Sequence, residues 1–135
     1  MTGSVPDRQT GGIVGLGTDL VEIHRFRLAM QRRTTLTQRL FSDAERDYAD
    51  GQHDPAKSLA ARFAAKEAVM KALGVGLGSF ALRDVEVVRD DDAGSPSLVL
   101  HGKAGTLARE RGVTGWFLSL THTDASAMAV AIATG

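Results

Sequence analysis

The chain has 135 residues, of which 43% are hydrophobic and 24% are charged, and its formal net charge is zero. These values are typical of one folded domain large enough to bury a core, and the balanced charge gives no support for general binding to nucleic acid or to an anionic membrane. The sequence has no cysteine, which excludes disulfides and thiolate metal sites and is compatible with a reducing, cytoplasmic location.

The first twelve residues, MTGSVPDRQTGG, contain no apolar run. This composition predicts a mobile N-terminal tail over residues 1–12 rather than a signal peptide, followed by a single domain over residues 13–135. No stretch approaches the roughly 18 uninterrupted apolar residues that a membrane-spanning helix requires. We therefore expect no membrane segment.

The first predicted element is a strand over residues 13–17, whose glycines permit close packing against a neighbouring element. The strand ends at Thr18 and Asp19, and Glu22 follows at the start of a helix. Two interpretations of Asp19 are open. It is either a functional carboxylate at a strand end or the N-cap of the helix, with Glu22 as its partner in a capping box.

The helix predicted over residues 22–31 leaves Arg25 on its outer face, with Arg27 nearer the edge. Both belong to a run of arginines that contains no acid between residues 25 and 39: Arg25, Arg27, Arg32, Arg33 and Arg39. The run is either a local patch that attracts an acidic partner or a solvated helix face.

Two shorter helical segments are predicted next. The first covers residues 36–41. The second begins at residues 42–45, SDAE, which have the Ser-x-x-Glu form of a capping box. Residues 51–55 then form a surface turn before the next helix.

Residues 58–74, SLAARFAAKEAVMKALG, give the strongest helix signal in the chain. Gly74 falls where a left-handed C-terminal cap is expected, and it opens a loop with three glycines that ends at Gly78. The alanines on one side of the helix are expected to lie flat against a sheet or another helix: Ala61, Ala65, Ala68 and Ala72.

Four charged side chains are predicted to project from this central helix: Arg62, Lys66, Glu67 and Lys71. Three of them are cations, and the glycine loop that follows the helix allows the backbone to approach a ligand closely. The alternative is an ordinary solvated helix face with a Glu-to-Lys pair.

Strands are predicted over residues 84–89 and 97–101 with a hairpin turn at residues 90–94 between them. The consecutive aspartates of this turn lack the spacing of a calcium loop. A short helix is predicted over residues 103–111, and two strands over residues 116–123 and 126–134 end the chain.

The last of these strands is small and apolar throughout, which predicts burial on both faces. His122 lies at the end of the preceding strand, on the same face as two leucines, and is either a structural histidine or a ligand-binding one. The order of the elements indicates an α+β fold in which a mainly antiparallel sheet packs against the long central helix.

Two segments together resemble the signature motifs of the 4'-phosphopantetheinyl transferases: residues 17–22, GTDLVE, and residues 62–72, RFAAKEAVMKA. The chain length and residues 119–123, SLTHT, are similar to the small type of that family. The resemblance covers nearly everything from Gly15 to Ala133, and it implies the fold of the family.

The resemblance also implies an activity. The family transfers the phosphopantetheine arm of coenzyme A to a serine of an apo acyl carrier protein and releases adenosine 3',5'-bisphosphate, in support of fatty acid biosynthesis. By family position, Asp19 and Glu67 hold Mg²⁺, and Lys71 stabilises charge on the pyrophosphate or leaving group. Either a metal-bound water or Glu67 accepts the serine proton, and Mn²⁺ as a substitute for Mg²⁺ stays open.

Family position further implies contacts with coenzyme A from Arg62, Lys66, Lys71, Gly76, His122 and Thr123. Of these, Arg62 and His122 are assigned to the phosphates of the adenosine end. Arg25 matches the family position that binds the acidic carrier protein, with Arg27 as a helper. The small transferases are homotrimers with active sites between subunits, so Asp19 and Glu67 of one subunit are expected to meet His122 of a neighbour.

Two alternative functions are compatible with parts of the pattern. A metal-dependent nucleotide pyrophosphatase shares the metal site but has no use for a carrier-binding helix. A non-enzymatic module that binds an acidic partner through the arginine run explains Arg25 but leaves Asp19, Glu67 and Lys71 without a role.

Overall fold

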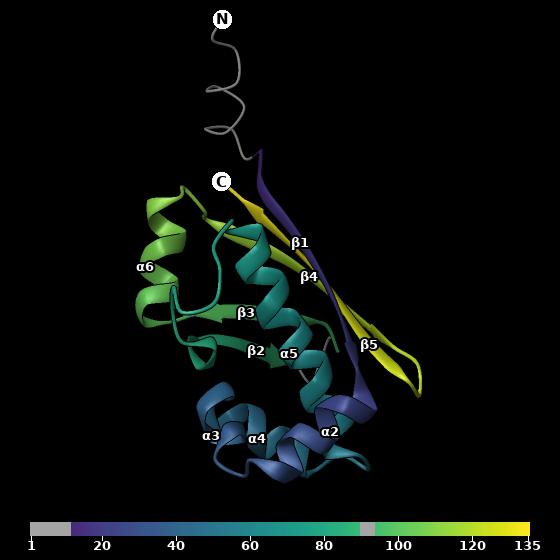
Figure 1. Cartoon of the computed structure of the whole chain (residues 1–135). Helices are drawn as coiled ribbons and strands as arrows, with labels where there is room; N and C mark the ends of the chain where they lie inside the picture. The colour runs from purple at the N-terminus through teal and green to yellow at the C-terminus, as the bar shows by residue number, and fades with distance from the viewer. Residues whose placement is uncertain (1–11, 90–93) are drawn as a thin grey trace, which may run out of the picture.

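The computed structural model describes residues 12–89 and 94–135 and contains two antiparallel sheets (Figure 1). The larger sheet has the strand order β1-β5-β4, and the smaller one pairs β2 with β3. The strands are Ile13–Glu22 (β1), Val85–Arg89 (β2), Pro96–Leu100 (β3), Gly115–His122 (β4) and Ser126–Thr134 (β5). The helices are Ile23–Arg32 (α2), Leu36–Leu40 (α3), Asp43–Asp50 (α4), Pro55–Ala72 (α5) and Gly102–Glu110 (α6), with a 3-10 turn at Leu82–Asp84.

Helix α5 runs along one face of the larger sheet and contacts β1 and β5, while α2, α3 and α4 gather near its N-terminal end (Figure 1). This arrangement confirms the predicted α+β fold with a mainly antiparallel sheet on a long central helix. No helix within the described ranges is both long and apolar enough to cross a membrane.

Parts of two predictions lie outside the described residues. They are residues 1–11 of the predicted tail and residues 90–93 of the predicted turn between β2 and β3. Gly12 is described, and its carbonyl oxygen accepts a hydrogen bond from the Gly135 amide at 3.0 Å. The division into a tail and a single domain stays a prediction.

Strand β1 is longer than predicted. It continues to Glu22 because its backbone pairs with β5 along this length, with Asp19 opposite Ala129 and Glu22 opposite Ser126. The prediction that the strand ends at Asp19 is therefore wrong. The capping interpretation is also wrong, because Glu22 itself occupies the N-cap of α2 and makes no side-chain capping bond.

The glycines of β1 let the strand lie directly on α5. A Cβ atom at Gly15 would stand 1.9 Å from the Ala72 carbonyl oxygen, and one at Gly17 would stand 1.8 Å from that of Ala68. Neither distance is possible for a real side chain, so the close packing predicted for these glycines is confirmed. The backbone contact fixes the position of Asp19 relative to the middle of α5.

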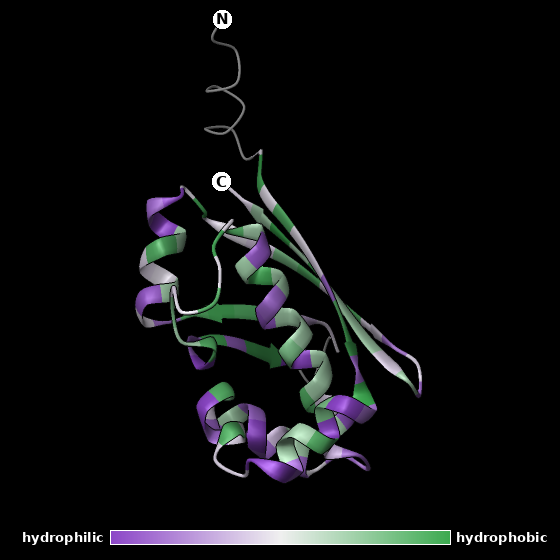
Figure 2. Ribbon diagram, in the orientation of Figure 1, coloured by the Kyte–Doolittle hydropathy of each residue, from purple (hydrophilic) through white to green (hydrophobic). Residues whose placement is uncertain are grey.

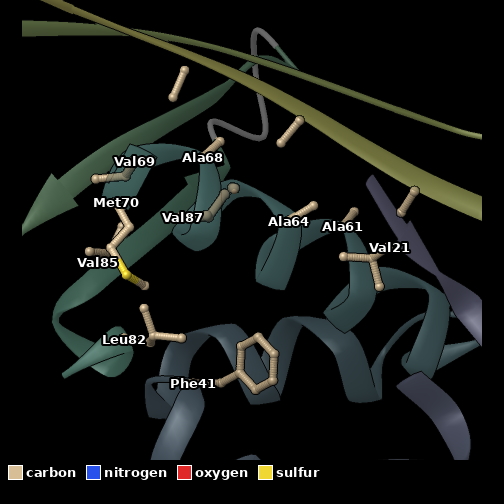
Figure 3. Close-up of a cluster of buried hydrophobic side chains, with 14 of the residues drawn as sticks. Val21, Phe41, Ala61, Ala64, Ala68, Val69, Met70, Leu82, Val85 and Val87 are labelled. Atoms are coloured by element: carbon tan, nitrogen blue, oxygen red, sulfur yellow. The ribbon is translucent and has the colours of Figure 1, made fainter. Parts of the chain in front are cut away.

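Small side chains fill the interface between α5 and the sheet. All four predicted alanines of α5 are buried, and Figure 3 shows Ala61 and Ala68 pointing toward the strands. Strand β5 offers Ala127, Ala129, Ala131 and Ala133 to the same interface, each with no exposed surface. Alanine on both sides lets the helix and sheet backbones approach closely.

The outer face of the larger sheet is not covered within the described chain. Alternate residues of β5, such as Met128, Val130 and Ile132, are partly exposed, so the prediction that β5 is buried on both faces is wrong for the single chain. Apolar residues of β1 and β4 share this face, with Leu20 67% and Phe117 68% exposed. We call this surface, formed by Ile13, Leu16, Leu20, Phe117 and Met128, the outer sheet face.

The predicted signals at helix ends are largely correct. Ser42 and Glu45 form the reciprocal capping box of α4, and Gly74 has the expected left-handed backbone with φ of 71°. Helix α5 begins at Pro55, three residues earlier than predicted, because proline is tolerated in the first helical turn.

Candidate active site

Asp19, Glu67 and Lys71 come together where β1 crosses α5. The Lys71 ammonium donates to the Thr18 carbonyl oxygen at 2.9 Å and to Asp19 Oδ1 at 3.1 Å. Glu67 lies one turn before Lys71 on the helix. Burial raises the pKa of Glu67, and the negative charge of Asp19 raises it further, whereas Lys71 lowers it. Asp19 and Glu67 are therefore near enough to repel each other, and we call these three residues the acid–lysine cluster.

The acid–lysine cluster is partly shielded from solvent yet accessible. The Asp19 side chain is 18% exposed, Glu67 is half-buried and Lys71 is 56% exposed. Two carboxylates without nitrogen or sulfur ligands match the preference of a hard cation such as Mg²⁺. The described residues contain no group of three or more potential metal ligands, so water or a substrate would have to complete the coordination.

Arg62 and His122 line a different hollow in the same chain. This cavity of about 390 Å³ lies beside the N-terminal half of α5, and its lining also includes Tyr48 of α4, Lys57 of α5 and Arg89 of β2. We call it the arginine cavity. None of the acid–lysine cluster lines it. The structure therefore confirms neither ligand role, but it does place the two residues predicted to bind adenosine phosphates in one concave site.

Arg62 is held firmly at the base of the arginine cavity. It is only 4% exposed, and its Nη1 donates to Ser58 Oγ at 3.0 Å. The guanidinium carbon lies 4.3 Å from the centre of the Tyr48 ring. Burial lowers the pKa of Arg62. A guanidinium in this position provides positive potential without being freely mobile.

Lys66 does not project from α5 as predicted. Figure 2 shows hydrophilic bands along the helix, but the Lys66 side chain is fully buried. Its ammonium donates to Glu45 Oε1 at 2.8 Å, to the Leu82 carbonyl oxygen at 3.1 Å and to the Val85 carbonyl oxygen. The prediction of an exposed Lys66 is wrong because three acceptors inside the protein satisfy its donors. Because the Lys66 ammonium is buried, the single chain does not support the predicted contact between Lys66 and coenzyme A.

Glu45 completes this internal network. Its Oε1 also accepts from the Ser42 amide, and its Oε2 accepts from the Val87 amide, each at 2.9 Å. The carboxylate thus links α4, α5 and β2 while it caps α4. Burial lowers the pKa of Lys66 and Glu45 raises it, so the ion pair opposes the effect of burial.

Gly76 and Thr123 lie outside the arginine cavity. Gly76 is exposed in the loop after α5, with open space around it, and the positive φ angles of this loop belong to Gly74 and Gly78. Thr123 is exposed in the turn between β4 and β5, where its Oγ1 accepts from the Ala125 and Ser126 amides at 3.1 Å. Their predicted contacts with coenzyme A stay predictions.

The two predicted carrier-binding arginines differ in their surroundings. Arg25 is exposed and lines an apolar groove of about 330 Å³ that begins at Asp19 and includes Phe26 and Phe63. Arg27 instead makes a bidentate ion pair with Asp54, at 2.8 and 2.9 Å, which ties α2 to the start of α5. One arginine of the run is therefore neutralised by an acid, Asp54, that lies outside residues 25–39.

Several residues of these sites were not found from the sequence. Tyr48 is the only tyrosine of the chain and stands in an otherwise polar helix, which is a weak signal. Arg89 ends a valine-rich strand and carries no signal of its own. The two lie near Arg62 only because α4 and β2 meet beside α5.

Comparisons with known proteins agree with this geometry. A model of the 4'-phosphopantetheinyl transferase superfamily matches residues 15–131. A holo-[acyl-carrier-protein] synthase of Moorella thermoacetica is 48% identical over 116 residues, which are 86% of this chain and 90% of that protein.

Two solved structures are similar in fold. The acyl carrier protein synthase of Plasmodium yoelii with ADP bound has a TM-score of 0.84 at 28% identity and covers 93% of this chain and 97% of its own. The holo-(acyl-carrier-protein) synthase of Bacillus anthracis in complex with CoA (3',5'-ADP) has a TM-score of 0.75 at 30% identity and covers 91% and 97%.

The chain belongs to the 4'-phosphopantetheinyl transferase superfamily. Within that superfamily, its relatives are the holo-[acyl-carrier-protein] synthases. The predicted family, fold and enzyme class are confirmed, as is the predicted transfer of phosphopantetheine to a carrier protein.

Proposed function

We propose that this chain transfers the 4'-phosphopantetheine group of coenzyme A to a serine of an apo acyl carrier protein at the acid–lysine cluster, in support of fatty acid biosynthesis. The observation that carries the proposal is the meeting of Asp19, Glu67 and Lys71 at the contact between β1 and α5. These side chains come from the two motifs that characterise the family, and the reaction needs both carboxylates and a cation beside a pyrophosphate.

Asp19 and Glu67 are the residues that would hold Mg²⁺. The fit rests on two oxygen donors that lie close together: burial raises the pKa of Glu67, and the negative charge of Asp19, which a cation would offset, raises it further. When bound, the ion supplies charge neutralisation at the pyrophosphate and orientation of the phosphorus that is attacked.

The protein side chains supply the remaining chemistry. The serine hydroxyl forms a bond to the β-phosphorus as the bond from that phosphorus to the bisphosphate leaving group breaks. The serine proton passes either to the Glu67 carboxylate or to a water beside it. Lys71, already within 3.1 Å of Asp19, stabilises the negative charge that develops on the leaving group.

Arg62 and His122 bind phosphate at the adenosine end of coenzyme A, and Gly76 and Thr123 are kept as contacts that the family position predicts. The shared arginine cavity supports the first assignment. We assign Lys66 a supporting role, since its ion pair with Glu45 holds α5 against α4 and β2.

Arg25 docks the acidic carrier protein. It is exposed beside an apolar groove that leads to Asp19, so a carrier bound there would present its serine near the acid–lysine cluster. Arg27 contributes less, because Asp54 already neutralises it.

A homotrimer would explain two features of the single chain. The outer sheet face exposes large apolar side chains that a symmetric interface would bury. The acid–lysine cluster and the arginine cavity are also separate within one chain, and a neighbouring subunit could bring one beside the other. A cytoplasmic location is part of the same proposal and agrees with the absence of cysteine.

One measurement separates this function from its alternatives. The full chain is incubated with Mg²⁺, coenzyme A and an apo acyl carrier protein, and both substrates are followed by mass spectrometry. We expect the carrier to gain the mass of one phosphopantetheine group. Hydrolysed coenzyme A with an unchanged carrier would instead indicate a nucleotide pyrophosphatase, and no change in either would indicate a binding module.

A further inference from the structure

Three consecutive residues of α5 point in three different directions. Successive side chains of an α-helix are about 100° apart, so Lys66, Glu67 and Ala68 have different surroundings. Ala68 is fully buried against the sheet, where its carbonyl oxygen would lie 1.8 Å from a Cβ atom at Gly17. Lys66 is fully buried among α4, the 3-10 turn and β2, and Glu67 lies between these two contacts, near Asp19. The direction of the Glu67 carboxylate therefore depends on how α5 is rotated about its own axis.

The sheet side of α5 controls distance more than rotation. The alanine methyl groups there set how closely helix and sheet approach, and the glycines of β1 bring the two backbones into contact. Methyl groups form no hydrogen bonds, which are the directional contacts of a folded chain, so they resist a rotation of the helix only through their shape. Figure 3 shows Ala68 on the strand side of α5 and Leu82 on the opposite side. Polar contacts on that opposite side are the ones that can fix the rotation.

The Lys66 ammonium makes such contacts with three separate elements. A lysine ammonium has three N–H donors, and each has an acceptor here. The acceptors are Glu45 Oε1 in α4 at 2.8 Å, the Leu82 carbonyl oxygen in the 3-10 turn at 3.1 Å and the Val85 carbonyl oxygen in β2. The ammonium also lies 5.4 Å from the centre of the Phe41 ring. Because the acceptors belong to different elements, a rotation of α5 would stretch at least one of these bonds.

Glu45, the charged acceptor, is itself held in place. Its Oε1 accepts from the Ser42 amide and its Oε2 from the Val87 amide, each at 2.9 Å, and Ser42 Oγ in turn donates to Glu86 Oε2 of β2 at 2.6 Å. A buried ion pair is weak evidence for stability, because apolar side chains of similar volume in its place are often neutral or stabilising. The fixed directions of these bonds point instead to a role in placing α5.

We propose that Lys66 and Glu45 are a positioning pair that fixes the rotation of α5 and thereby directs the Glu67 carboxylate toward Asp19. The inference rests on the proposed function and adds to it two residues that act through Glu67 without touching the substrate. Side-chain ends lie roughly 5–6 Å from the axis of a helix, so a rotation of about 10° moves them by about 1 Å. A displacement of that size can lower a rate about 100-fold. Lys71, one turn after Glu67, would move with it.

The test replaces the positioning pair by a neutral pair of nearly the same volume. The double variant Lys66→Met/Glu45→Gln removes both buried charges together, so it avoids the uncompensated carboxylate that Lys66→Met alone would leave. We expect kcat for transfer to an apo acyl carrier protein to fall about 10- to 100-fold, while KM for each substrate changes by less than about twofold. An unchanged kcat would overturn the proposal, and so would a loss that arises from KM alone.

Two single variants separate positioning from stability. Glu45→Asp keeps both charges but draws the acceptor back by one methylene group, so kcat should fall about 3- to 10-fold; an unchanged kcat in a folded Glu45→Asp chain would also overturn the proposal. Ser42→Ala removes the side-chain cap of α4 and the bond to Glu86 but leaves the Lys66–Glu45 bond in place. It should lower the urea midpoint and leave kcat within about twofold. A fall in kcat equal to that of the double variant would overturn the proposal, since any loosening of α4 would then have the same effect.

A structural measurement keeps this inference separate from the proposed function. In crystal structures of the unmodified chain and the double variant, the distance between the Asp19 and Glu67 carboxylates should increase by about 1 Å in the variant. An unchanged distance would overturn the inference. The comparison needs neither substrate, so a chain that shows the displacement but modifies no carrier would contradict only the proposed function. A transferring chain whose kcat is unaffected by the double substitution would contradict only the positioning role.

Discussion

Two lysines on the same helix have opposite environments. Lys66 is fully buried, and its ammonium is bonded to Glu45 and two carbonyl oxygens. Lys71 lies five residues later, is 56% exposed and faces two carboxylates that repel each other. The first charge is neutralised within the protein and stabilises the fold. The second pairs with Asp19 at the protein surface, where a ligand has access to it.

The arginines of α2 show the same contrast. Asp54 holds Arg27 in a bidentate ion pair, whereas Arg25 is exposed and has no ion-pair partner among the residues that the structure describes. Residue type does not tell which member of each pair, Lys66 or Lys71 and Arg27 or Arg25, is held by a partner from another element and which is exposed. The difference comes from acceptors brought in by other elements, which are 21 and 27 positions away in sequence.

The largest loss of stability is expected from breaking the buried ion pair between Lys66 and Glu45. Lys66→Met leaves the buried Glu45 carboxylate without its counter-charge, which typically costs about 3–5 kcal/mol of unfolding free energy. Urea denaturation measures this loss. Lys71→Met serves as the matched control and should change the midpoint little, because Lys71 is exposed. Similar losses in the two variants would mean that the contrast between the lysines has no consequence for stability.

The next effect concerns the other lysine. Lys71→Ala should lower kcat by roughly 10²–10³, or about 3–4 kcal/mol, because it removes a positioned donor to developing charge. Its unfolding midpoint should stay close to that of the unmodified chain. Steady-state transfer assays and urea denaturation are run on the same preparation, with Lys103→Ala as an exposed control on α6. A fully active Lys71→Ala enzyme would remove Lys71 from the mechanism.

A smaller effect on activity is expected at Arg25, the exposed arginine of α2 without an ion-pair partner among the described residues. Arg25→Glu reverses a charge that would attract an acidic carrier, so KM for the carrier should rise at least about tenfold, with a weaker effect at high salt. The affinity for coenzyme A should be nearly unchanged. Both are measured by varying one substrate at a time. Equal losses for the two substrates would reject a docking role that is separate from catalysis.

The smallest effect is expected at Arg27, which is paired with Asp54, and it is a change in unfolding free energy that depends on pH. Arg27, through its hydrogen bonds, lowers the pKa of Asp54 from 3.8 to about 2. A lowered carboxyl pKa stabilises the fold above the unfolded value and loses that contribution as the pH falls toward the folded value. Since both side chains are about a third exposed, Arg27→Gln should cost only about 0.5–1 kcal/mol at pH 7.

The pH series supplies the check on this last prediction. Urea denaturation of Arg27→Gln and the unmodified chain at pH 7, 4 and 3 should give a difference that is constant down to about pH 4 and then decreases. A difference that persists unchanged at pH 3 would mean that Arg27 stabilises the protein by packing rather than through Asp54.

Sequence reasoning was most successful where the signal is local. The capping box at Ser42, the glycine cap at Gly74 and the alanine side of α5 all depend on residues within a few positions of one another. The structure also brings Asp19, Glu67 and Lys71 together, as the resemblance to a family implied, whereas their roles stay predictions.

The errors arose where a distant strand or side chain decides the outcome. Strand β1 extends past Asp19 because β5 pairs with it, more than a hundred residues later in the chain. Lys66 is buried because Glu45 of the neighbouring helix α4, which was predicted only as a capping residue, accepts a hydrogen bond from its ammonium. No local pattern placed Tyr48 and Arg89 beside Arg62, since three separate elements meet there.

The contact of Gly15 and Gly17 with α5 has a consequence for how this enzyme tolerates change. The placement of Asp19 relative to Glu67 follows from main-chain atoms of β1 and α5 that lie in close contact, not from adjustable side chains. Even a methyl group at Gly17 would push the strand outward and carry Asp19 away from Glu67. The backbone at this crossing therefore leaves almost no room for substitution at Gly15 and Gly17.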